Sequence, residues 1–202
     1  MSGSTPLELF CNWLCRLWWL NTAFLVLTLS GGLLFGLCPA TVTVCLMLRR
    51  YLNGQHSVSA GQLWQVYRAE FVRANALGLT LLVPAFAAFW YCALAQHTKD
   101  TLLATASLAL LPLGVFLALW CYSALVGQSI YAAGSLGAAL KNGLILLGQG
   151  RVLVLTLICT LTVALTESAL PLLALFVGLT PVLFTTVGLL WYTHPELKVQ
   201  PL

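Results

Sequence analysis

The side chains that could do acid–base chemistry are few in this sequence and lie far apart along it. The 202 residues include five carboxylates and three histidines, and no two carboxylates form a pair suited to general acid–base catalysis. No serine-centred nucleophile elbow, zinc-binding motif or phosphate loop occurs. We therefore predict no enzyme activity, no catalytic residue and no cofactor. The carboxylates are Glu8, Glu70, Asp100, Glu167 and Glu196, and the histidines are His56, His97 and His194.

The seven cysteines offer thiol and metal chemistry, but their pattern favours neither. Their number is odd, no Cys-x-x-Cys pair occurs, and nearly all of them lie in apolar runs. Cys11 and Cys15 fall on one helix face, but no histidine or second pair completes a metal site. We interpret the cysteines as small buried hydrophobic residues and predict no metal site. The others are Cys38, Cys45, Cys92, Cys121 and Cys159.

The composition is that of a membrane protein. Hydrophobic residues make up 60% of the chain and charged residues 7%, against about 25% charged residues in a soluble domain. A chain of this size has too little interior to hide so much apolar surface from water. We predict an all-α, polytopic transmembrane helix bundle, with residues 1–202 forming one integral membrane domain.

The net charge of +4 is spread between apolar segments. This distribution is a signal of membrane topology, and we predict no nucleic-acid partner. No signal peptide of the usual form is present, so we expect the first helix to remain.

The stretch from Pro39 to Asn75 should orient the other segments. It carries four of the nine cations, and short Lys/Arg-rich loops lie on the cytoplasmic side of membranes. Before and within it, Gly and Pro residues interrupt a long apolar run. We predict a hairpin with a span at 17–36, a turn near Cys38-Pro39 and a short returning helix at 40–52. One kinked span is the alternative.

The segment 62–75 is predicted to form an amphipathic helix. Trp64, Tyr67, Phe71 and Ala74 follow helical spacing and define one stripe. A basic helix with an aromatic stripe suits a membrane surface. Two interpretations remain: a segment that simply leads into the next span, or a docking surface for a cytoplasmic partner.

The rest of the chain predicts four further spans and a second cytoplasmic stretch. That stretch, 127–151, contains Ser135 as a helix cap and a helix at 136–147. The total is six membrane helices, one of them short, with both termini in the cytoplasm. The last two spans divide at Thr166-Glu167-Ser168. The four spans lie at 76–95, 101–126, 152–166 and 169–192.

Three polar residues stand out near or inside the spans: Asn21, Thr41 and Asn75. In lipid, an amide must find partners within the protein. We expect Asn21 to make a structural hydrogen bond between helices, with a substrate-facing role as the alternative. We expect Thr41 to cap the short helix after Pro39, and Asn75 and Asn142 to tie the cytoplasmic segments to the bundle.

Three blocks of sequence resemble the YesL-like family of small bacterial membrane proteins. One is Asn21 followed by the segments 36–41 and 49–54, the second is 64–75, and the third is 140–142 followed by 150–153. Cys38 stands where the family often has glycine. The resemblance implies a bacterial cytoplasmic membrane protein linked to carbohydrate uptake by importers of the ABC type, and it brings no established biochemical activity.

We therefore expect an accessory or regulatory protein of carbohydrate uptake that acts through its cytoplasmic helices on ABC importer subunits. A homo-oligomer is a further possible assembly. A small carrier that moves a neutral solute along Asn21, Thr41 and Gln128 is the alternative. The lipid bilayer is the other expected partner. The predicted docking residues are Trp64, Tyr67, Arg68, Phe71, Arg73, Lys141 and Asn142.

Overall fold

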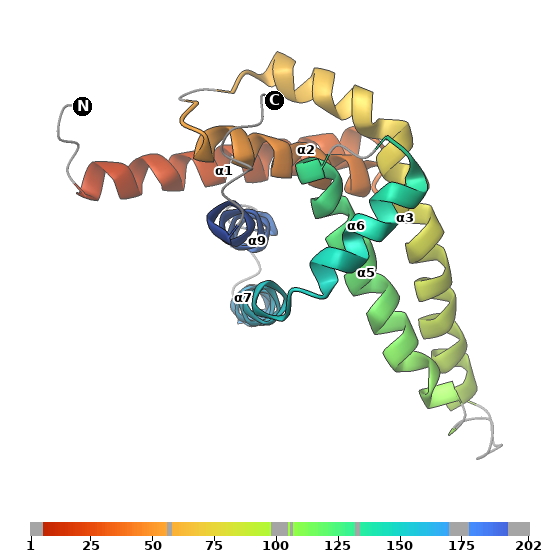
Figure 1. Ribbon diagram of the computed structural model, residues 1–202. Helices are drawn as coiled ribbons and strands as arrows, with labels where there is room; N and C mark the ends of the chain where they lie inside the picture. Colours follow the sequence, from red (N-terminus) through yellow and green to blue (C-terminus); the bar gives the residue numbers. More distant parts are fainter. Residues whose placement is uncertain are drawn as a thin grey trace. The chain divides into compact units, whose positions relative to one another are not determined.

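The computed structural model describes residues 6–55, 58–97, 105, 107–131, 134–169 and 178–193, and this part of the chain is helical without strands. The all-α prediction is confirmed. Two compact units occur, Met1–Glu70 with Gly150–Leu202, and Phe71–Gln149, and each is described by itself. In chain order the helices are α1 (Pro6–Ser30), α2 (Leu34–Leu52), α3 (Ala60–Gln96), α5 (Leu110–Tyr131), α6 (Leu136–Leu147), α7 (Gly150–Ala169) and α9 (Thr180–Thr193) (Figure 1).

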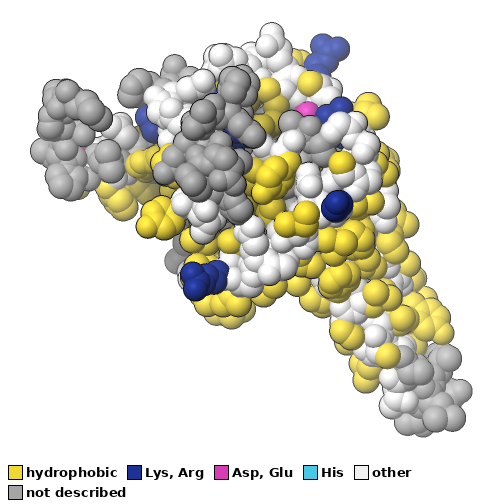
Figure 2. Space-filling model, in the orientation of Figure 1, with side chains coloured by type: hydrophobic (Ala, Val, Ile, Leu, Met, Phe, Trp, Pro, Cys, Tyr) yellow, Lys and Arg dark blue, Asp and Glu magenta, His cyan; other side chains and the backbone are white. Residues whose placement is uncertain are grey.

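Two of the described helices, α3 and α5, are long and apolar enough to cross a membrane. The consecutive helices α6 and α7 would make a third span if the two count as one broken span. Figure 2 shows hydrophobic side chains on the visible face along α3 and α5. This supports a membrane protein, whereas the count of six membrane helices and the cytoplasmic placement of the termini stay predictions.

Helices α1 and α2 pack against each other as the predicted hairpin. The predicted turn near Cys38-Pro39 is wrong, because the chain turns at 31–33 and Pro39 lies inside α2. Gly32 adopts a φ of 69°, a conformation that glycine reaches without steric cost. Gly32 therefore allows the turn. Pro39 lies inside α2, where it removes one backbone hydrogen bond and crowds the carbonyl of Phe35.

Gly31 and Gly36 allow α1 and α2 to lie close together. A Cβ atom on Gly36 would collide with the backbone of Thr28 in α1, and one on Gly31 would collide with the Tyr67 hydroxyl. Small residues at a helix contact let the backbones approach closely in a membrane protein. Helix α9 packs on both α1 and α2, as well as on α7. The unit's largest fully buried side chains include Leu20, Val42, Val44, Met47, Leu48, Leu183 and Leu190.

The predicted helix at 62–75 and span at 76–95 form one continuous helix, α3. Its start is fixed by a capping box, in which Ser59 N donates to Gln62 Oε1 over 3.2 Å and Gln62 N donates to Ser59 Oγ over 3.3 Å. Its first eleven residues belong to the first unit and the remainder to the second.

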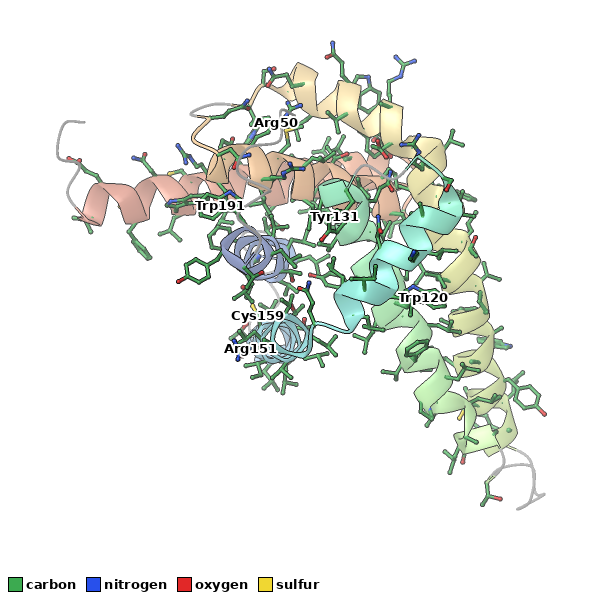
Figure 3. The ribbon with its side chains drawn as sticks, in the orientation of Figure 1. Arg50, Trp120, Tyr131, Arg151, Cys159 and Trp191 are labelled. Carbon is green, nitrogen blue, oxygen red and sulfur yellow. The ribbon has the colours of Figure 1, made fainter. Side chains whose placement is uncertain are left out.

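The second unit is built on the contact of α5 with α6. Gly143 of α6 lies against Ala124 of α5, and Trp120 Nε1 donates to the Leu140 carbonyl over 2.9 Å (Trp120 is labelled in Figure 3). The predicted cap of α6 is confirmed, since Ser135 Oγ accepts from Ala138 N over 3.3 Å. Of the predicted span at 101–126, residues 101–104 lie outside the described part, and α5 continues to Tyr131.

The predicted break at Thr166-Glu167-Ser168 is wrong, because α7 continues through these residues to Ala169. The hydroxyls of Thr166 and Ser168 donate to the carbonyls of Val163 and Leu165 within the same helix, both over 2.8 Å. A helix in an apolar medium therefore tolerates these polar residues, since each hydroxyl finds an acceptor one turn back.

Candidate functional site

The predicted docking stripe on α3 is only partly an exposed surface. Tyr67 is 3% exposed, and Leu63 and Ala74 are also buried. The buried face of the helix therefore includes Tyr67 and Ala74 of the predicted stripe and has Leu63 in place of Trp64. Trp64 is 45% exposed and stacks on Tyr67, with ring centroids 5.6 Å apart and an interplanar angle of 18°. Arg68 is exposed in the next turn. Trp64 and Arg68 are thus the surface residues of this group.

Four predicted docking residues belong to the second unit. Arg73 and Lys141 are exposed, whereas Phe71 and Asn142 are half-buried. The backbone of Asn142 lies beside Gly127 of α5. Lys141 is therefore the exposed cation of α6, on the helix that Ser135 caps.

Two of the three polar residues predicted near or inside the spans, Asn21 and Thr41, form hydrogen bonds within the protein. Thr180 Oγ1 donates to Asn21 Oδ1 over 2.9 Å, and both residues are buried, which agrees with the structural interpretation of Asn21. The predicted capping role of Thr41 is wrong, because its hydroxyl donates to the Leu37 carbonyl inside α2 over 2.9 Å. Asn75 is 8% exposed, and its Nδ2 has no acceptor among the described residues.

The Asn21–Thr180 hydrogen bond should contribute a measurable but small part of the stability. We expect the Asn21→Leu and Thr180→Val variants to show a coupling energy of about 0.6 kcal/mol, and at most about 1.7 kcal/mol, in a double-mutant cycle. Unfolding by denaturing detergent would measure it. A coupling energy of zero would mean that Thr180 and Asn21 do not form this bond in the folded protein.

A cluster that the sequence did not predict surrounds Arg16. Its guanidinium lies over the ring of Trp13 at 5.2 Å and over the ring of Tyr51 at 5.0 Å, measured to the centroids. Tyr51 lies on α2, and its hydroxyl is held by a backbone hydrogen bond from Val58. The tryptophans beside Arg16 are a visible signal in the sequence, but no local pattern connects Arg16 with Tyr51.

A pocket of about 410 Å³ opens at this cluster. A second pocket, of about 260 Å³, lies between α1 and the start of α3. Trp19 lines both, so the two are adjacent. The first is lined by Asn12, Cys15, Arg16, Trp19 and Tyr51, and the second by Trp19, Thr22, Ala23, Val26, Leu27, Ala60, Leu63 and Trp64.

The described residues contain no group of three His, Cys, Asp or Glu side chains placed to hold a metal ion.

The interpretation of the cysteines as buried residues needs a correction. Cys38, Cys45, Cys92 and Cys121 are buried, but Cys11 and Cys15 are exposed on α1. The reason is that α1 packs on its neighbours with its second half, while most of its first three turns remain uncovered.

Comparison with known proteins finds a family that part of this chain resembles. Residues 17–92 match the family described as "Protein of unknown function, DUF624". The matched segment takes in most of α1, all of α2 and most of α3, so it contains Trp19, Tyr51 and Trp64. Arg16 precedes its first residue.

Three relatives from Bacillus subtilis (strain 168) carry the names "Uncharacterized protein" YesV, YteU and YesL. YesV is 40% identical over 70 residues, YteU 38% over 73 and YesL 28% over 89. These alignments cover 34%, 36% and 44% of the present chain, and 34%, 33% and 43% of the relatives. The resemblance to the YesL-like family is thereby confirmed. No solved structure matches the chain.

Proposed function

We propose that this chain is an integral protein of the bacterial cytoplasmic membrane that assists carbohydrate uptake by contacting an ABC-type importer through the start of α3. The YesL-like resemblance supplies the link to carbohydrate uptake. The observation that carries the contact is the exposed Trp64 beside Arg68, since aromatic residues and arginine dominate the binding energy of protein interfaces.

The geometry of Trp64 favours such a role because the ring is already held in place. Its stacking on the buried Tyr67 fixes one face, and the capping box of Ser59 and Gln62 fixes the first turn of the helix. A side chain that is ordered before binding loses less conformational entropy when a partner covers it. Arg68 adds a cation for an acidic group on the partner.

We expect the Trp64→Ala variant to weaken binding to the importer by about thirtyfold, the equivalent of about 2 kcal/mol for a central interface residue. Affinity purification from native membranes would identify the importer subunits, and a binding titration with those subunits would give the ratio. Tyr192→Ala is the matched control, because Tyr192 is an aromatic residue of the same unit that is 79% exposed.

Two results would contradict the proposal at different points. If deletion of the gene leaves uptake unchanged across a broad panel of oligosaccharides, the role in carbohydrate uptake is wrong. If uptake depends on the gene but Trp64→Ala binds the importer as the unmodified protein does, the contact lies elsewhere on the chain.

A further inference from the structure

Among the described residues, the guanidinium of Arg16 is held by two aromatic rings and has no anionic partner. Trp13 and Tyr51 present their ring faces to it, and within the described residues no hydrogen bond or ion pair reaches its N–H groups. No carboxylate is among the described residues that line the adjoining pocket, where Asn12, Cys15 and Tyr51 supply the uncharged polar groups. An arginine with free donors in a fixed plane is suited to binding the two oxygens of a phosphate.

The second pocket, between α1 and the start of α3, is an apolar groove, whereas the first is polar. Its lining is aliphatic and aromatic apart from Thr22, whose hydroxyl donates to the Trp18 carbonyl over 3.0 Å and is thereby satisfied within α1. From Arg16 to Leu27 the rise along α1 is roughly 16 Å at 1.5 Å per residue. The polar pocket, Trp19 and the apolar groove thus follow one another along a single helix.

We propose that this continuous site binds an anionic phospholipid, with the phosphate on Arg16 and one acyl chain along the groove. The arrangement of a cationic pocket followed by an apolar groove identifies the ligand as a lipid. A sugar or a free anion would use the cationic pocket and leave the apolar groove empty, whereas a lipid satisfies both. The tryptophans beside Arg16 agree with this, because such residues gather at the level of the lipid headgroups.

The test uses the full-length protein purified from mixed micelles or nanodiscs that contain phosphatidylglycerol and phosphatidylcholine. The lipids that remain bound are counted by mass spectrometry. We expect phosphatidylglycerol to be retained preferentially, and Arg16→Gln to reduce that preference about fivefold, the factor equivalent to about 1 kcal/mol for one basic residue at an anionic lipid surface. Arg151→Gln should leave it unchanged, since Arg151 is an exposed arginine beside an apolar pocket elsewhere in the same unit.

A second pair of variants tests the groove even if Arg16→Gln does not fold. Val26 lines the groove and is 59% exposed, so Val26→Trp should fill the groove without entering the core and should reduce retention of both lipids several-fold. Val154→Trp is the control, since Val154 is 53% exposed beside the pocket of Arg151.

Three outcomes would overturn the proposal. Equal loss of preference in Arg16→Gln and Arg151→Gln would mean general attraction of cations to anionic lipid. Unchanged retention in a folded Val26→Trp variant would mean that the groove holds no chain. Displacement of the lipid by an equal concentration of glycerol phosphate would mean a site for small anions. Trp64 also lines the groove, so the two proposals are separated by their readouts: these results measure lipid retention, whereas the importer contact is measured as binding to importer subunits.

Discussion

Replacing Gly36 with leucine should lower the free energy of unfolding by about 3 kcal/mol, at the upper end of the cost of overpacking. The Cβ atom would meet the carbonyl group and Cα of Thr28. These are backbone atoms of α1, so no side-chain rotation relieves the contact. The helices α1 and α2 would have to separate, and the packing of α9 on both would be disturbed. Thermal unfolding followed by tryptophan fluorescence should show a midpoint lower by roughly 6–12 °C.

Gly188→Leu is the matched control for Gly36→Leu. Gly188 also lies in a helix of the first unit, but no atom lies within 4 Å of a Cβ added there. This control should unfold at or slightly above the temperature of the unmodified protein, because glycine in a helix costs roughly 0.5–1 kcal/mol relative to alanine. Equal unfolding temperatures for the two leucine variants would show that α1 and α2 are not in close contact at Gly36.

Replacing Gly143 with leucine should destabilise the second unit by about 2–3 kcal/mol. An added Cβ would lie 2.6 Å from Ala124 Cβ, 2.7 Å from Ala124 Cα and 2.9 Å from Ala124 N. Because two of these atoms are backbone atoms of α5, α6 would have to move away. That movement would stretch the hydrogen bond from Trp120 to Leu140, which joins the same two helices. A shift in tryptophan emission should therefore accompany the loss of stability.

The same helix offers a control for Gly143→Leu. Gly137 is the second residue of α6, is exposed, and has no atom within 4 Å of an added Cβ. Gly137→Leu should be neutral or slightly stabilising, measured as resistance to unfolding by denaturing detergent. If both α6 variants lose stability equally, the cause would be the loss of glycine in α6 and not its contact with α5.

Local features of the chain were predicted well because they depend on neighbouring residues. The apolar composition and the helical spacing of the runs identify an all-α membrane protein, and the Ser135 cap is a short-range hydrogen bond that the sequence displays. The capping box at Ser59 and Gln62 was equally local and was missed, because the amphipathic segment was assigned a start at Gln62 itself. The helix was thus predicted correctly, but its start was placed too far along the chain.

The errors in helix boundaries share one physical reason. The sequence predicts helix breaks at Pro39 and at the polar residues 166–168. In α2 and α7 they lie inside helices, since hydroxyl groups donate to carbonyls of the preceding turn and one missing N–H is tolerated. The chain turns instead at 31–33, where Gly32 has the positive φ that glycine adopts without steric cost.

By itself, the sequence determined the class of the protein, the helical content and the family resemblance, since these follow from composition and near-neighbour spacing. Only the tertiary structure decided which distant residues meet. It brought Thr180 to Asn21, placed Tyr51 over Arg16, and set Trp64 on the surface beside a buried Tyr67. These pairings depend on which faces of α1, α2, α3 and α9 pack together, and helix packing is set by the shapes of all the side chains in contact, which no local pattern encodes.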